Sequence, residues 1–229
     1  MFKEFGSGGL GLADNSGARV AHSSELDALI ALEHIGMRRS FTRDEEIYAE
    51  GDRSDCWFRV VAGTVRSCKL LADGRRHIPE FFFAGDSFGL DAADERFASA
   101  EAVGDVVVMR YPRGATERLL DERPELARRM CSATLRGLTH AHARMLLLGR
   151  MTATERVASF LLELAERRDA KRAVELPMSR YDIADYLGLT IETVSRVLSA
   201  FKRDGAIAVP SPHRIEFRDR NMLAELCEA

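Results

Sequence analysis

The chain has 229 residues, enough for one large domain or two small ones with an ample core. Hydrophobic residues make up 46% and charged residues 30%, which is typical of a soluble globular protein, and no apolar run reaches the ~18 residues of a membrane span. The net charge of −3 argues against a non-specific nucleic-acid coat protein. No basic and then apolar leader is visible, so we expect a cytoplasmic protein with no membrane partner.

Cofactor and enzyme chemistry have little support in this sequence. The four cysteines, at positions 56, 68, 131 and 227, are scattered and form neither a zinc-binding pattern nor a disulfide framework. The chain contains no G-x-S-x-G, no H-E-x-x-H and no phosphate-binding P-loop. We therefore expect a protein that is not an enzyme and that holds no metal or other cofactor.

The first residues predict a tail and then a helix. Residues 1–22 are rich in Gly, Ser and Ala, and we expect them to be a flexible N-terminal tail. Ser24 can cap a helix that runs to about Ile35, with Leu26, Leu29 and Ile30 facing inward.

Short strands follow as far as residue 111. Glycine and aspartate turns, of which Asp73-Gly74 is a good two-residue hairpin signal, separate segments at 37–41, 46–49, 56–61, 64–71, 76–83, 97–102 and 106–111. Many short strands at this spacing predict a sandwich or rolled barrel of the jelly-roll kind. We place this β-roll domain at residues 23–124.

After Pro124 the pattern becomes helical to about Leu148, and we assign residues 125–149 to one long helix. Small or apolar residues recur alternately four and three positions apart, which is the spacing of a coiled-coil seam; they are Ala127, Cys131, Thr134, Leu138, Ala141, Met145 and Leu148. The alternative is a helix packed lengthwise on its own β-roll, and we expect the neighbouring Leu126 and Met130 to pack in that way. The seam predicts a homodimer.

A second domain is predicted at residues 150–229. Gly149-Arg150-Met151 interrupts the periodicity and is interpreted as a hinge. Thr152 and Glu155 then form a capping box for a helix to about Arg168, and residues 173–176 form a short strand.

Two short helices joined by a tight turn come next. Ser179 and Asp182 give the S-x-x-D start signal, Gly188 ends the first helix, and Thr190 caps the second. The second helix buries Val194, Val197, Leu198 and Phe201, and its remaining residues point outward. Residues 206–209 and 214–217 then pair as a β-wing across Ser211-Pro212-His213.

The outward face of the second helix carries groups that suit the major groove of DNA. Arg196 can fork onto guanine O6 and N7, Glu192 can accept from cytosine N4, and Ser195 is short enough to let the backbone come close. The alternative is an ordinary helical hairpin in which Glu192 and Arg196 form a surface ion pair. The two caps, the glycine turn and the following wing together favour DNA readout.

Any phosphate contacts must depend on local placement, because residues 151–229 contain 12 Lys/Arg and 13 Asp/Glu, a net charge of −1. Arg180 lies at a helix start, beside free N–H groups that favour an anion. We expect the phosphate contacts to come from Ser179, Arg180, Thr190, Thr193 and Lys202.

Two sets of residues carry a resemblance to a known family. The segment Ile191-Glu-Thr-Val-Ser-Arg196 resembles the recognition helix of the CRP/FNR family of bacterial transcription regulators, and its E-x-x-S-R form resembles the FNR and FixK branch. The order I-x-x-E-G-D, V-x-x-G-x-V and F-x-x-G-D-x-F-G resembles the family's cyclic-nucleotide-binding β-roll. The resemblance implies an α+β fold: a β-roll, a long central dimerisation helix and a C-terminal winged helix-turn-helix.

The resemblance also bears on a possible effector. Phe97 follows Arg96 where cyclic-AMP-binding relatives place a small donor, and the central helix offers Gly137, Ala141 and His142. We therefore expect a degenerate nucleotide pocket after Gly85-Asp86-Ser87, with Arg96 at the surface or ion-paired. Residues 1–55 contain no cysteine, so the iron–sulfur cluster of oxygen-sensing relatives is not expected.

The resemblance implies a homodimeric transcription activator that binds a palindrome of TTGAT-type half-sites through Glu192, Ser195 and Arg196. It also implies contact with RNA polymerase and control of genes for low-oxygen respiration, denitrification or nitrogen fixation. We expect no obligatory small-molecule effector. The alternative is a ligand-gated regulator of the same family, with haem on His77, His140 or His142, or with a cyclic nucleotide.

Overall fold

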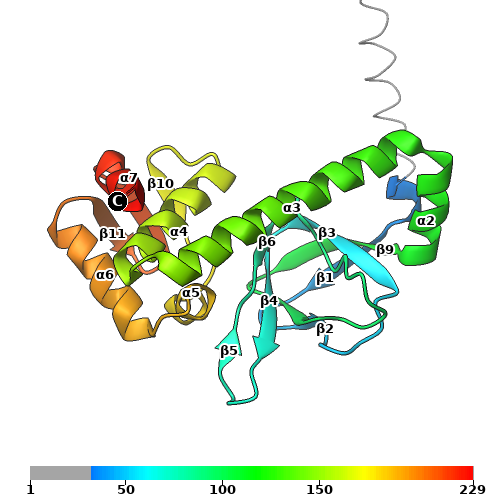
Figure 1. Cartoon of the computed structure of the whole chain (residues 1–229), viewed down its shortest axis with the longest axis horizontal. Coiled ribbons are helices and arrows are strands. Elements are labelled where there is room, and N and C mark those ends of the chain that lie inside the picture. Colours follow the sequence, from blue (N-terminus) through cyan, green and yellow to red (C-terminus); the bar gives the residue numbers. More distant parts are fainter. Residues whose placement is uncertain (1–31, 229) are drawn as a thin grey trace, which may run out of the picture.

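The computed structural model describes residues 32–228, except the side chains of residues 136 and 228. It consists of a β-roll, a long helix and a smaller C-terminal domain, and the long helix crosses from the first of these to the last (Figure 1). The predicted tail and most of the predicted first helix lie outside the described residues. Residues 32–35 are helical, with Leu32 buried, as expected for the end of that helix.

Two antiparallel sheets form the β-roll. One sheet has the order β1-β9-β3-β7, and the other has the order β2-β8-β4-β5 with β6 also paired to β4. The strands of the roll are β1 (Met37–Phe41), β2 (Glu46–Tyr48), β3 (Cys56–Ala62), β4 (Thr64–Leu70), β5 (Arg76–His77), β6 (Phe81–Phe83), β7 (Ser87–Phe88), β8 (Ser99–Ala102) and β9 (Val106–Pro112). Alternating residues such as Phe58, Val60, Val106 and Val108 fill the core between the sheets.

One predicted strand is broken in the structure. The segment 76–83 is not continuous, because it divides into β5 and β6 and leaves the sheet between them. Ile78, at the break, is fully buried, and its backbone N–H donates to Asp185 O in the C-terminal domain at 3.4 Å. The prediction of one strand was therefore wrong, because contact with another domain competes with the sheet at this point.

Two helices follow the roll. The sequence did not predict α2 (Arg113–Glu122), whereas α3 (Pro124–Arg150) matches the predicted long helix. Proline at its first turn is compatible with helix initiation. The predicted break at Gly149-Arg150-Met151 is confirmed at Met151, which is extended, and is wrong for Gly149 and Arg150, which are helical.

Part of α3 covers the roll and part of it does not. Leu126 is buried and Met130 packs beside it against the roll, as predicted. Further along, Leu138 is 52% exposed and Met145 is 70% exposed. An apolar stripe of this kind on one helix is unusual for a surface that meets only water.

The C-terminal domain is a helix-turn-helix with a wing. Its elements are α4 (Ala153–Arg167), β10 (Ala173–Glu175), α5 (Arg180–Leu187), α6 (Ile191–Arg203), β11 (Ile207–Ser211), β12 (Arg214–Phe217) and the unpredicted α7 (Arg220–Glu228). The capping box of Thr152 and Glu155 forms as predicted. Strands β11 and β12 pair as the predicted wing, with β10 on the other side of β12.

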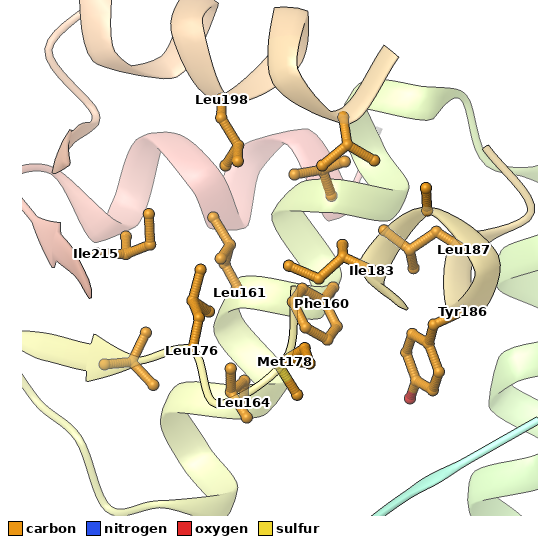
Figure 2. Close-up of a cluster of buried hydrophobic side chains, with 14 of the residues drawn as sticks. Phe160, Leu161, Leu164, Leu176, Met178, Ile183, Tyr186, Leu187, Leu198 and Ile215 are labelled. Atoms are coloured by element: carbon orange, nitrogen blue, oxygen red, sulfur yellow. The ribbon is translucent and has the colours of Figure 1, made fainter. Parts of the chain in front are cut away.

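The core of this domain extends into the β-roll. Figure 2 shows Phe160, Leu161, Leu164, Met178 and Ile183 gathered between α4 and α5, with Tyr186 at the edge of the group. The Tyr186 ring lies 5.0 Å from the ring of Phe81, which belongs to β6 of the roll. The two domains are therefore joined by apolar contacts as well as by the covalent connection through α3.

The turn between α5 and α6 depends on a left-handed residue. Gly188 ends α5 with φ of 63°, and Leu189 N–H then bonds Ala184 O at 2.9 Å. Residues with a Cβ rarely adopt this conformation, so glycine is required by the backbone. A Cβ here would meet nothing closer than 3.7 Å, so packing adds little to the requirement.

We expect Gly188→Ala to lower the free energy of unfolding by about 1–2 kcal/mol, because alanine must enter the left-handed region. Gly114→Ala is the control, since Gly114 lies in α2 with open space around it. There the same change should raise stability by up to about 1 kcal/mol. Urea unfolding of both variants measures the difference, and equal effects would contradict the assignment.

Candidate nucleic-acid interface

The start of α5 is held by a reciprocal cap. Asp182 N–H donates to Ser179 Oγ at 3.1 Å, and Ser179 N–H donates to Asp182 Oδ2 at 3.0 Å. The Ser179 hydroxyl also donates to the same carboxylate oxygen at 2.8 Å. The capping box predicted from S-x-x-D is confirmed, and it places Ser179 and Arg180 at the entrance of the helix-turn-helix.

Helix α6 separates its two faces cleanly. Val194, Val197, Leu198 and Phe201 are buried, as predicted. Glu192 and Arg196 are exposed, and Ser195 lies half-buried between them along the helix. The buried face fixes the rotation of α6 about its axis, so the three predicted readers share an accessible surface.

The two long side chains on this face are not joined by a salt bridge. The Arg196 guanidinium donates to the Thr193 hydroxyl at 3.4 Å, and no ion pair joins it to Glu192, although the structure describes both residues. Hydrogen bonding to its own backbone N–H and to the Thr190 hydroxyl lowers the pKa of Glu192, and the charge of Arg196 helps to lower it. The carboxylate is therefore an acceptor at neutral pH, and the surface ion pair considered as an alternative is not formed.

The predicted phosphate contacts fall into two groups. Thr190 and Thr193 lie together at the start of α6, where Thr193 N–H donates to Thr190 Oγ1 at 3.3 Å. Arg180 reaches across from α5 to donate to Ser195 Oγ at 3.4 Å. The structure thus brings Arg180 beside the reading face of α6.

Arg180 and Lys202 line a cleft of about 320 Å³ between α6 and the wing. The other lining residues are Leu198, Ser199, Val209, Pro210, Ser211 and Pro212. Two of the lining residues are basic and none is acidic, although the whole C-terminal domain is slightly acidic. Sequence reasoning missed Ser199 and the wing as parts of this cleft, because only the fold brings residues 209–212 to α6.

Arginine side chains anchor the far end of α5. Arg156 on α4 donates to Leu187 O at 3.1 Å, to Leu148 O at 2.8 Å and to Met151 O at 2.9 Å. Arg144 on α3 donates to Tyr186 O at 2.9 Å and stacks on the Tyr186 ring. These carbonyls terminate α3 and α5, so Arg156 ties the end of the long helix to the helix-turn-helix.

The region that would bind a cyclic nucleotide is engaged internally. The Arg96 side chain is 1% exposed and donates to Gly89 O at 2.7 Å, to Asp91 at 3.0 Å and to Cys56 O. It also stacks on the ring of Tyr48. The expectation that Arg96 is ion-paired is confirmed, and it is not at the surface.

Asp86, in the Gly85-Asp86-Ser87 segment, bonds a different part of the chain. Its carboxylate accepts from Phe83 N–H and from Arg167 on α4. Asp86 and Arg96 therefore take part in two separate contacts within the chain.

His77, His140 and His142, the three candidate axial ligands, have different surroundings in the structure. His77 Nδ1 lies 3.1 Å from Asp185 O, whereas His140 and His142 are exposed on α3. Within residues 32–228 there is no group of three or more His, Cys, Asp or Glu side chains placed to hold a metal ion. In the same part of the chain, none of the helices is long and apolar enough to cross a bilayer.

Comparison with known proteins identifies the class. Residues 38–123 match the cyclic nucleotide-binding domain and residues 155–226 match the Crp-like helix-turn-helix domain. The nitrogen fixation regulation protein FixK of Bradyrhizobium diazoefficiens is 44% identical over 192 residues, covering 81% of each chain. The chain belongs to the CRP/FNR family of transcription regulators.

Further matches refine the placement. FixK of Rhizobium meliloti is 38% identical over 86% of this chain and 94% of its own. The solved structure of FixK2 from Bradyrhizobium japonicum superposes with a TM-score of 0.81 at 43% identity, covering 85% of this chain and 98% of that one. The protein is a DNA-binding transcription regulator of the FixK/FNR branch, and it is not an enzyme.

We expect Arg156→Met to lower the free energy of unfolding by about 2–3 kcal/mol, because carbonyls at the ends of two helices lose a charged donor. Arg150→Met removes the same charge from an exposed position at the end of α3 and should change stability by less than about 0.5 kcal/mol. Thermal or urea unfolding compares them. A loss no larger than that of Arg150→Met would show that the Arg156 contacts contribute little.

Proposed function

We propose that this protein is a transcription activator that binds, as a homodimer, a palindrome of TTGAT-type half-sites. The observation that carries the proposal is the accessible surface of Glu192, Ser195 and Arg196 on a helix whose opposite face is buried. Such a helix presents a donor fork and a carboxylate acceptor at the spacing of neighbouring base pairs.

Each reader has a separate role in the proposal. Arg196 donates to O6 and N7 of guanine, and Glu192 accepts from the N4 amino group of cytosine. Ser195 keeps the helix close to the base edges, and its bond with Arg180 holds that guanidinium near the DNA backbone. The ionised state of Glu192 supports its assignment as the acceptor.

Phosphate contacts would set the register of α6 in the groove. Arg180 and Lys202 would bind phosphates from the cleft beside the wing, while Thr190 and Thr193 would bind them at the start of α6. Ser179 lies at the start of α5, where the helix dipole favours an anion, but it would have to give up a bond to Asp182 to bind a phosphate.

The homodimer would form through the exposed stripe of α3. Five of its seven predicted residues are exposed in the single chain and the other two are half-buried. Pairing two such helices would remove Leu138 and Met145 from water, and it would relate the two α6 helices by a two-fold axis. A symmetric pair of readers requires a palindromic site.

Effector-free binding is supported by the state of the β-roll. Because Arg96 already has three protein oxygens as partners, a cyclic phosphate would have to displace contacts that stabilise the roll. The scattered histidines favour no haem. We infer a regulator that is competent for DNA binding as folded.

The biological role is proposed from relatives. Similar chains are named for nitrogen fixation regulation and for transcriptional activation, and a more distant one for anaerobic regulation. We infer that the protein activates genes for nitrogen fixation, denitrification or low-oxygen respiration through contact with RNA polymerase.

Binding to a TTGAT-NNNN-ATCAA duplex should occur without any added ligand. Arg196→Ala should weaken it by about 1–3 kcal/mol per half-site and relax discrimination at the contacted guanine. Arg203→Ala, on the same helix but exposed and paired with Asp204, is the control for loss of charge. Mobility shifts measure both, and equal losses would contradict base readout by Arg196.

Leu138→Asp should convert the dimer into monomers, because two carboxylates would face each other in the seam. Ala143→Asp is the control, since Ala143 lies on the opposite side of α3 and is exposed. Sedimentation velocity separates the two species. A dimer that survives Leu138→Asp would show that another surface joins the protomers.

A further inference from the structure

Helix α5 lies against the β4–β5 hairpin of the β-roll. Arg66 on β4 and Arg76 on β5 reach its carboxylates, although more than a hundred residues separate them in the chain. Arg66 is 8% exposed and Asp182 is 3% exposed, so these groups meet away from water. None of the DNA-reading residues takes part in this contact.

The two oxygens of the Asp182 carboxylate accept hydrogen bonds from different parts of the chain. Oδ2 accepts from the Ser179 N–H and hydroxyl and so completes the cap of α5. Oδ1 accepts from Arg76 at 2.6 Å and from Arg66 at 3.3 Å. Asp182 therefore both caps α5, the first helix of the helix-turn-helix, and bonds this helix to the β-roll.

A second set of bonds lies one turn further along α5. Arg76 Nε donates to Asp185 Oδ2 at 2.7 Å, and Ile78 N–H donates to Asp185 O at 3.4 Å. Arg76 thus bridges Asp182 and Asp185, which lie three residues apart on one face of α5. The β4–β5 hairpin bonds α5 at both Asp182 and Asp185, so it constrains the direction of the helix axis as well as the position of the helix.

On the other side, Arg66 is itself positioned by the roll. It bonds Glu101 at 2.7 Å and Asp44 at 2.9 Å. Burial lowers the pKa of Arg66, but the hydrogen bond to Glu101 and the charge of Asp182 more than offset this, so the guanidinium stays charged. The contact is therefore not lost through deprotonation of Arg66.

The apolar contacts beside these bonds do not by themselves determine the angle between α5 and the β-roll. The rings of Phe81 and Tyr186 and the side chain of Ile78 form the adjoining contact. Apolar burial is non-directional, whereas hydrogen-bonded ion pairs require defined geometry. The ion pairs thus give direction to the contact between the β-roll and α5 and, through the Gly188 turn, favour one orientation of α6, alongside the bond of Arg167 on α4 to Asp86.

We propose that Arg66, Arg76 and Asp182 are positioning residues that set the orientation of the reading helix relative to the dimer axis. They would thereby determine the half-site spacing that the dimer accepts, in place of a bound effector. The inference rests on the proposed function, since spacing has meaning only for a dimer on two half-sites. The base contacts themselves would not depend on these residues.

The test compares Arg76→Gln with Arg75→Gln. Both remove one positive charge from the same hairpin, but the exposed side chain of Arg75 bonds the nearby Asp73, whereas the side chain of Arg76 bonds Asp185 of α5. Binding is measured on a single half-site and on palindromes with three, four or five base pairs between half-sites. Arg76→Gln should weaken binding at the preferred spacing by about tenfold and flatten the dependence on spacing.

Single-half-site binding and the conservative variant Arg76→Lys separate a loss of orientation from a loss of base contacts. Single-half-site affinity of Arg76→Gln should stay close to that of Arg75→Gln, and Arg76→Lys should restore part of the spacing preference. Equal spacing profiles for Arg76→Gln and Arg75→Gln would overturn the inference while leaving the proposed function intact. Failure of the wild-type dimer to bind any of these duplexes would instead overturn the proposed function.

Discussion

The geometry of the DNA-binding domain depends on one buried carboxylate that two parts of the chain share. Asp182 caps α5 through Ser179 and accepts from Arg66 and Arg76 of the β-roll. Because α6 follows α5 through a single left-handed glycine and packs on the same core, a constraint on α5 is also a constraint on the reading face. Breaking such a buried pair leaves an uncompensated charge, so the contact strongly disfavours other arrangements.

The β-roll matches the cyclic nucleotide-binding domain, but the side chains of Arg96 and Asp86 bond other residues of the same chain. Arg96 binds the loop that contains Gly89 and Asp91, and Asp86 binds Arg167 of the C-terminal domain. Arg96 and Asp86 are thus both engaged within the chain, and Asp86 joins the roll to the C-terminal domain.

The long helix α3 links the β-roll to the surface that is proposed to form the dimer. Its first turns pack on the roll through Leu126, its last turn is bonded to the reader through Arg156, and its middle leaves Leu138 and Met145 exposed. One helix thus contacts both domains and carries the surface proposed to bind a second copy. The proposed dimer seam and the carbonyl of Leu148 that Arg156 bonds would then lie along one continuous segment of α3.

By itself the sequence determined most of the local elements, although not α2 and α7, because caps, glycine turns and apolar periodicity act between near neighbours. The capping boxes at Thr152 and Ser179 and the exposed face around Arg196 followed from such patterns. Only the tertiary structure decided where the strand at 76–83 breaks and what Asp182 binds. Arg66 lies 116 positions from Asp182, and no local pattern encodes which of many charged residues will meet once the two domains pack together.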